Sequence, residues 1–253
     1  MCAMPLEEEI EYPTSDGQPM AETTLHREVM SDTISALERR YADVPDVWVG
    51  GNLFLYYRQG DPSACIAPDV LLARGVTKWK RPIYLLWDEG CPPAIVFEIT
   101  SQSTRREDLG TARKGKPNKK EIYQSLGVDE LIFFDPYGEY LKPRLQGYRL
   151  DGQGRYQSIP AYPDGSLESR TTGLTLRAEG ERLRLVDPST GERLLWNDEL
   201  EAARRSAEER AAEETVARRA AEERAAAEAA ARQAAEERLR LLEQELARLR
   251  SRD

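Results

Sequence analysis

Apolar residues recur at intervals of three and four in the first patterned part of the chain, and this spacing predicts a helix. The pattern starts after Thr23 or Thr24, either of which suits the N-cap, and Pro45 lies beyond its end. The positions on the predicted buried face are Val29, Met30, Thr33, Ile34, Leu37 and Tyr41. Residues 1–20 are acidic and interrupted by prolines, so we expect an extended lead-in there.

Short apolar runs bounded by Gly, Pro, Asn or Asp follow and predict strands. The expected strands are 47–49, 53–57, 70–73, 94–100 and 131–135, and later hairpin segments are 148–150, 156–159, 174–177 and 182–186. A second helix is expected at 118–126, because Asn118 and Glu121 have capping-box spacing and Gly127 suits the C-terminal cap. We therefore predict an α/β (α+β) fold in which helices flank a mixed sheet.

The last part of the chain, after Gly191, is rich in Ala, Glu and Arg and contains no further Gly or Pro. These are strong helix formers, so a long C-terminal helix is expected. A heptad spacing is visible only at Leu239, Leu242, Leu246 and Leu249. Two interpretations stay open: a single solvated helix, and a coiled-coil surface for a homodimer or a partner protein. The predicted organisation is a lead-in at 1–20, a domain at 21–190 and this helix at 191–253.

Charge and cysteine content narrow the function classes. Residues 197–253 hold 15 acidic and 12 basic residues. Residues 1–196 hold the other 30 acidic and 24 basic residues, so this part has a net charge of −6. No broad basic field for duplex DNA is present, although carboxylates that bind divalent cations are themselves acidic. Three cysteines without paired spacing support neither a disulfide framework nor a zinc site. No signal peptide or membrane-spanning run is visible, so we expect a cytoplasmic protein with no membrane partner.

Two acids on predicted strands are the main candidates for chemistry. Asp69 follows Pro68 at the head of one strand, and Glu98 interrupts an otherwise apolar strand. Alternation places Ile95, Phe97 and Ile99 on one face of that strand and Ala94, Val96, Glu98 and Thr100 on the other. A buried carboxylate is costly unless it is paired, hydrogen-bonded or bound to a metal, and this cost indicates a function.

A lysine on the second helix is the predicted partner of these acids. Lys119, Ile122, Tyr123 and Leu126 fall at helical spacing on the inward stripe, whereas Lys120 does not. A lysine in the first turn also opposes the helix dipole, which makes it a poor choice for stability alone. The single histidine, His26, begins the first helix, where a buried and hydrogen-bonded imidazole is favoured over catalysis.

Several sequence blocks resemble a known family. PDVLLARGV, PPAIVFEITSQST and KKEIYQSLGVDELIFFDP, with Asp108 before the last block, resemble the Uma-type putative restriction endonucleases of the PD-(D/E)XK nuclease superfamily, over roughly residues 20–190. The resemblance implies a restriction endonuclease-like fold and a metal-dependent endonuclease that hydrolyses phosphodiester bonds of DNA. It implies Asp69, Glu98 and Lys119 as catalytic residues. Mg²⁺, with Mn²⁺ as a substitute, would be bound by Asp69, Glu98 and the backbone carbonyl of Ile99.

The sequence departs from the superfamily pattern at the lysine. Thr100 stands two residues after the acid, where the superfamily has a lysine, and the Uma-type lysine four residues before a helix tyrosine carries over to Lys119 through Tyr123. An insertion at 110–118 makes Lys114, Lys116 and Lys120 alternatives. The alternative function is a catalytically weak nuclease-fold scaffold that acts through its C-terminal helix.

Accessory roles are predicted for a further set of residues. Glu22 and His26 match a Glu-x-x-x-His start of the family's first helix, and Asp108 belongs to the motif. The basic residues around the insertion are candidates for contact with the phosphate backbone of a nucleic acid. A loop whose charges are merely solvated explains them equally well. These basic residues are Arg105, Arg106, Arg113, Lys114 and Lys116.

Overall fold

The computed structural model describes residues 10–15, 23–102, 104, 108 and 117–250. The chain divides into two compact units, Met1–Asn197 and Asp198–Asp253. The first holds the sheets and the short helices. The second consists of the long helix α5 (Asn197–Arg250) beyond its first residue, as expected from the Ala, Glu and Arg content.

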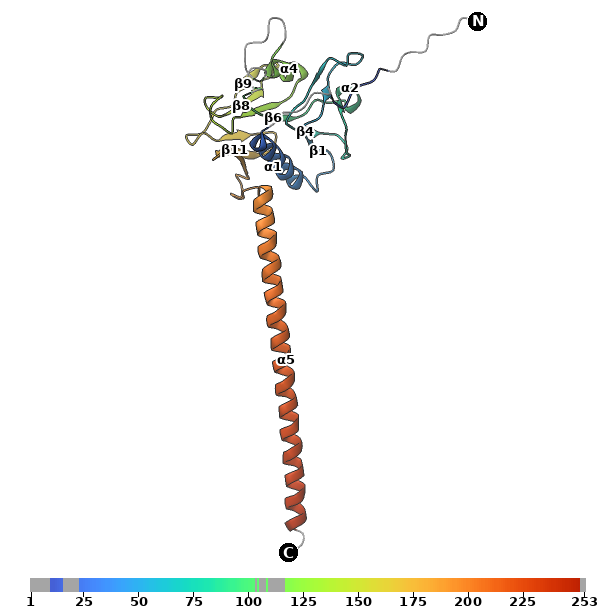
Figure 1. Cartoon of the computed structure of the whole chain (residues 1–253), viewed down its shortest axis with the longest axis vertical. Coiled ribbons are helices and arrows are strands. Elements are labelled where there is room, and N and C mark those ends of the chain that lie inside the picture. Colours follow the sequence, from blue (N-terminus) through green and yellow to red (C-terminus); the bar gives the residue numbers. More distant parts are fainter. Residues whose placement is uncertain (1–9, 16–22, 103, 105–107, 109–116, 251–253) are drawn as a thin grey trace, which may run out of the picture. The chain divides into compact units, whose positions relative to one another are not determined.

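A six-stranded mixed sheet forms the centre of the first unit, in the order β1-β4-β6-β7-β8-β9 (Figure 1). Its strands are β1 (Val47–Gly50), β4 (Val70–Arg74), β6 (Ile95–Ile99), β7 (Glu130–Phe134), β8 (Leu145–Leu150) and β9 (Tyr156–Ser158). Only β6 and β7 run parallel among these neighbouring pairs. The expected hairpin segments 148–150 and 156–159 lie in β8 and β9, so this hairpin continues the central sheet.

The central strands are buried on both faces, and their side chains alternate between two hydrophobic clusters. Val70, Leu72, Ile95, Phe97, Ile99, Ile132 and Phe134 belong to one cluster, and Leu71, Ala73, Val96, Leu131 and Phe133 to the other. Ala94, which directly precedes β6, packs in the first cluster, against the predicted alternation. Glu98 shares the face of Val96, as the period of two requires.

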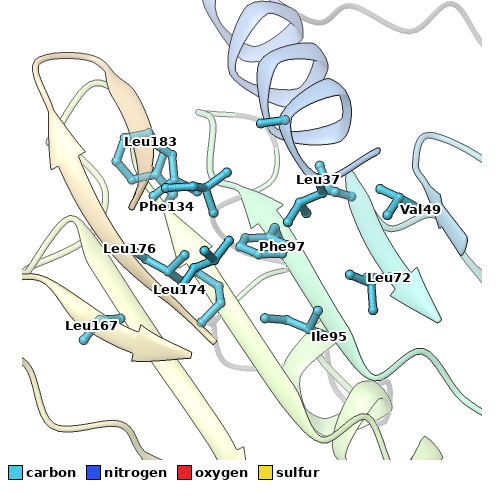
Figure 2. Packing of buried hydrophobic residues seen from close by; sticks show 14 of the residues in the cluster. Leu37, Val49, Leu72, Ile95, Phe97, Phe134, Leu167, Leu174, Leu176 and Leu183 are labelled. Carbon is cyan, nitrogen blue, oxygen red and sulfur yellow. The ribbon is translucent and has the colours of Figure 1, made fainter. Parts of the chain in front are cut away.

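The helix α1 (Thr24–Arg40) and a second sheet cover the first face (Figure 2). That sheet contains β10 (Leu167–Ser169), β11 (Leu174–Glu179) and β12 (Arg182–Val186). Leu37 of α1 and the leucines of β11 and β12 converge on Phe97 and Phe134. Thr23 is the N-cap of α1, since its hydroxyl accepts a hydrogen bond from the backbone N–H of His26.

The opposite face is covered by the helix α4 (Lys119–Leu126) and a small three-stranded sheet. The small sheet contains β2 (Leu55–Tyr56), β3 (Cys65–Ile66) and β5 (Tyr84–Leu85), and α2 (Leu86–Glu89) follows directly. Asn118 caps α4 with the predicted capping box, and Gly127 ends it in the left-handed region at φ 82°. These caps fix where α4 starts, and Lys119 is its first residue.

None of the helices in the described ranges is both long and apolar enough to cross a bilayer. The exposed surface of α5 is mostly polar or alanine, and its large exposed apolar side chains include Leu239, Leu241 and Leu242.

Candidate active site

The two strand acids meet at one end of the central sheet. The antiparallel register of β4 and β6 pairs Val70 with Phe97, and one further step sets Asp69 opposite Glu98. Asp69 directly precedes β4 and Glu98 lies on β6, so the two acids come from adjoining strands. The charge of Asp69 acts to raise the pKa of Glu98.

Asp69 is held by two donors from different elements. The backbone N–H of Ile99 lies 2.6 Å from Asp69 Oδ2, and Nε2 of His26 lies 3.2 Å from the same oxygen. Burial acts to raise the pKa of Asp69, but the hydrogen bond from His26 and the charge of Lys119 outweigh it, so this pKa is lowered. Asp69 is thus kept as a carboxylate whose orientation is fixed by α1 and β6.

Glu98 is almost completely buried, at 1% exposure, and both of its oxygens are bonded. Lys119 Nζ donates to Oε2 at 2.6 Å, and the hydroxyl of Tyr123 donates to Oε1 at 2.5 Å. Burial raises the pKa of Glu98 to about 8; the lysine lowers it, and the neighbouring Asp69 and Asp108 raise it further.

Lys119 and Lys120 point to different surroundings. Lys119 also lies 3.5 Å from Asp108 Oδ1, so it sits between two acids. Burial acts to lower the pKa of Lys119, but Glu98, Asp108 and Asp69 outweigh it and raise this pKa above its usual value. Lys120 instead lies 3.4 Å from the ring centre of Tyr148. The structure therefore brings Lys119 into the acid cluster and leaves Lys120 outside it.

Asp108 is a third acid beside this lysine. It is fully buried, and the hydroxyl of Thr104 donates to its Oδ2 at 3.0 Å. Burial is the main reason that its pKa is raised, with Lys119 acting in the opposite direction. The Thr100 hydroxyl and Oδ1 of Asp108 are both buried without an aligned hydrogen bond in the described part of the chain. The Thr100 hydroxyl acts to lower the pKa of Asp108, so Thr100 lies beside this acid.

Some sequence candidates cannot be located. Glu22 and the basic residues of the predicted phosphate-binding cluster lie outside the described residues; these are Arg105, Arg106, Arg113, Lys114 and Lys116. Asp135, the residue after β7 and the last of the expected strand 131–135, is a buried acid that is bonded within its own turn. Its carboxylate accepts backbone N–H groups from Tyr137, Gly138, Tyr140 and Leu141. This explains Asp135 by turn formation and keeps it out of the cluster.

Tyr123 belongs to the cluster but was not among the site residues predicted from sequence. Its ring is fully buried, and burial raises the pKa of its hydroxyl well above the usual value, with Glu98 acting in the same direction. A buried tyrosine hydroxyl needs an acceptor, and Tyr123 lies four residues after Lys119 on the inward stripe of α4. That spacing was the signal that could have identified it.

The donor chemistry of the cluster fits a hard divalent cation. Asp69, Glu98 and Asp108 gather around one lysine in a buried site, and the pKa values of Glu98 and Asp108 are raised there. A bound cation would favour the ionised form of these carboxyl groups. Carboxylate and carbonyl oxygens are the ligands that Mg²⁺ prefers. Within the described ranges, no three His, Cys, Asp or Glu side chains form a ready-made ligand group. A cation would therefore depend on two carboxylates, a backbone carbonyl and water.

Comparison with known proteins agrees with the sequence blocks. Residues 1–179 match the model of the Uma2 family, described as putative restriction endonucleases. A solved structure of a putative nuclease belonging to DUF820 from Anabaena variabilis is 14% identical, with a TM-score of 0.41, and the match covers 61% of this chain and 76% of that chain. A search of curated proteins found no match. Because the family model spans well over half of its length, the chain belongs to the Uma2 family of putative restriction endonucleases.

Proposed function

We propose that this protein is a divalent-metal-dependent endonuclease that hydrolyses phosphodiester bonds of DNA. One observation carries the proposal: Lys119 Nζ lies 2.6 Å from Glu98 Oε2, at the sheet end where Asp69 stands opposite Glu98. Carboxylates that can bind a divalent cation, with a lysine beside them, can support metal-assisted phosphodiester hydrolysis. The family assignment supports the nuclease class. The metal dependence and the DNA substrate are part of this proposal.

Asp69, Glu98 and the backbone carbonyl of Ile99 would hold Mg²⁺ or Mn²⁺. When bound, the cation supplies Lewis acidity at the scissile phosphate and makes nearby water more acidic. Both donors to Asp69 bind its Oδ2, so Oδ1 is the oxygen that we assign to the cation. His26 is thereby a positioning residue that acts through Asp69.

Lys119 and Tyr123 organise the other side of the site. Tyr123 fixes one oxygen of Glu98 and Lys119 the other, so this carboxylate has one orientation before any substrate arrives. The ammonium of Lys119 would orient the attacking water and offset negative charge that builds on the phosphate during hydrolysis. Because Lys119 and Tyr123 both come from α4, this one helix would position the lysine and the tyrosine of the site.

Nicking of supercoiled plasmid DNA tests this proposal. The full chain should nick the plasmid with Mg²⁺ or Mn²⁺ and stop when EDTA is added, and Asp69→Ala or Glu98→Ala should abolish nicking. Lys119→Met should slow it by roughly 100-fold or more, since it removes a preorganised charge. Lys120→Met is the matched lysine variant on the same turn, and its effect should stay within about threefold, because Lys120 contacts Tyr148.

Persistence of cleavage in both Asp69→Ala and Glu98→Ala would contradict the mechanism. A larger loss in Lys120→Met than in Lys119→Met would move the lysine role to Lys120. Calorimetric titration with Mg²⁺ adds a readout that needs no substrate. Binding that depends on Asp69 is expected, whereas a scaffold with an inactive site would show no Asp69-dependent binding.

A further inference from the structure

A groove of about 500 Å³ lies along the outer edge of β1, away from the hydrogen bonds of the proposed catalytic cluster. Because β1 ends the order of the central sheet, one of its edges has no strand partner within that sheet. One wall is the edge itself, residues 47–51, and the segment 78–81 also lines the groove. This segment has the sequence Lys-Trp-Lys-Arg in a chain whose net charge is −9.

Trp79 forms an exposed aromatic platform in this groove. Its side chain is 53% exposed, which leaves a large apolar surface in water. The guanidinium of Arg81 lies 4.9 Å from the Trp79 ring and 4.5 Å from the Trp48 ring. Glu89 holds that guanidinium with two hydrogen bonds of 2.6 and 2.9 Å. The charge of Arg81 is therefore paired with Glu89, and its guanidinium makes a cation–π contact with the indole of Trp79.

Two lysines flank the platform. Lys78 Nζ lies 2.5 and 2.9 Å from the carbonyl oxygens of Tyr41 and Ala42, so its charge is fixed at the groove without a carboxylate partner among these contacts. Lys80, which follows Trp79 in the chain, is exposed and also lines the groove. Glu38 also lines the groove, so the balance is two ammonium groups against one carboxylate. This alternation of cation, aromatic ring and cation suits a strand that presents phosphates and bases in turn.

One residue that lines the groove, Gly51, packs against the backbone of a proposed metal ligand. A Cβ atom at Gly51 would lie 2.0 Å from the carbonyl oxygen of Asp69. The next residue, Asn52, donates its backbone N–H to the carbonyl oxygen of Pro68 at 2.9 Å. Only glycine allows the groove wall to approach Asp69 so closely. A chain bound along the groove would thus be led from Trp79 toward the sheet end that carries Asp69.

We propose that this groove binds an unpaired segment of a nucleic acid strand, with one base stacked on Trp79 and the adjoining phosphates near Lys78 and Lys80. The inference rests on the proposed function for the nature of the ligand and adds a substrate class to it. A base inside an intact duplex cannot reach an aromatic side chain, so the ligand is single-stranded or locally opened. A peptide strand added to the β1 edge would have no use for the lysine–tryptophan alternation.

Fluorescence anisotropy with the full chain in EDTA tests the inference without cleavage. The probes are a labelled oligothymidylate of about 12 nucleotides and a blunt duplex of similar length. Trp79→Ala should weaken oligothymidylate binding by roughly 10-fold or more, Trp79→Phe should retain most of the affinity, and duplex binding should change by less than about threefold. Lys80→Glu should also weaken binding and reduce its dependence on salt.

Tyr162→Ala is the matched control, because Tyr162 is 48% exposed and does not line this groove. It should leave oligothymidylate binding unchanged. A Trp79→Ala protein that melts like the wild type and binds oligothymidylate within about twofold of it overturns the inference. So does a Trp79→Ala change that alters only self-association, which would assign the groove to a second copy of the chain. Because binding is measured without metal, these results are independent of whether plasmid nicking depends on Asp69.

Discussion

Glu98 is the residue at which stability and the proposed chemistry oppose each other. A carboxylate with 1% exposure sits among Asp69, Asp108 and a single lysine, in a strand that is otherwise apolar. Burial raises the pKa of Glu98 to about 8, well above its ordinary value of 4.5. Between these two pH values the folded protein binds more protons than the unfolded chain, so its stability falls as pH rises through this range.

We therefore predict that Glu98→Gln stabilises the metal-free protein at pH 8. Glutamine can keep an acceptor for Lys119 or Tyr123 but cannot ionise, so the variant should lack the loss of stability between about pH 4.5 and 8. Each pH unit between these values contributes at most about 1.4 kcal/mol, so the gain at pH 8 should be largest and should shrink toward pH 5. Thermal unfolding in EDTA measures it.

Adding Mg²⁺ supplies the control for this prediction. Binding to the folded state raises the melting temperature of the wild type by mass action, and Glu98→Gln should show a smaller rise because it lacks one proposed ligand. A variant that is less stable than the wild type at both pH values would show that the lysine–glutamate pair stabilises the fold by more than its burial costs.

The helix α4 is the element on which the candidate site depends most. It supplies Lys119 in its first turn and Tyr123 one turn later, and both bind Glu98. The position of that first turn is set by Asn118, whose side chain accepts from the backbone N–H of Glu121 at 2.8 Å. A fraying start of α4 would displace the lysine directly.

Asn118→Ala is therefore expected to affect stability and activity together. Loss of an N-cap costs about 1 kcal/mol, which for a chain of this size lowers the melting temperature by roughly 2 to 4 °C. Plasmid nicking should fall more than this loss of stability explains, since Lys119 is held by the first turn. Asn118→Asp retains the capping oxygen and should restore both readouts. The measurement compares the unfolding curves and the plasmid-nicking rates of the same protein preparations. A wild-type nicking rate in Asn118→Ala would contradict the expectation.

Local sequence signals predicted the elements that carry the site. The spacing after Thr23, the capping box at Asn118 and the apolar run around Glu98 identified α1, α4 and β6, because caps and periodicity act within one element. The same spacing favoured Lys119 over Lys120, and the structure places the two lysines accordingly, although their catalytic roles stay predictions.

The elements and contacts that sequence did not predict depend on the folded chain. The strands β3 and β5 are two residues long, too short for a period to be visible. Both pair with β2, which lies inside the expected strand 53–57. The bonds from His26 to Asp69 and from Tyr123 to Glu98 join residues 43 and 25 positions apart. No pattern within one element fixes which buried polar groups will meet across such distances.

At the scale of the whole molecule, the chain combines a unit with two buried clusters and a helix with almost no buried surface. The helix α5 is stabilised locally by helix-forming residues and by ion pairs four residues apart, such as Arg204 with Glu208 and Arg232 with Glu236. Its exposed leucines are the exception to this polar surface. Leu239 is 60% exposed and Leu242 52% exposed, and both belong to the heptad spacing.

These leucines lead us to predict that the full chain forms a weak, concentration-dependent dimer through the end of α5. A seam of a few leucines buries little area, since the upstream positions hold mostly Ala, Arg and Glu, so association should be reversible. Light scattering over a range of concentrations should show a rising mass for the full chain and a constant monomer mass for a chain that ends at Ala203. Changing Leu239 and Leu242 to Glu together should abolish the rise. Val216→Glu, at a position 68% exposed and outside the seam, should leave it intact. A monomer mass of the full chain at every concentration would contradict this prediction. In that case α5 is a single solvated helix, or its leucines bind a different protein.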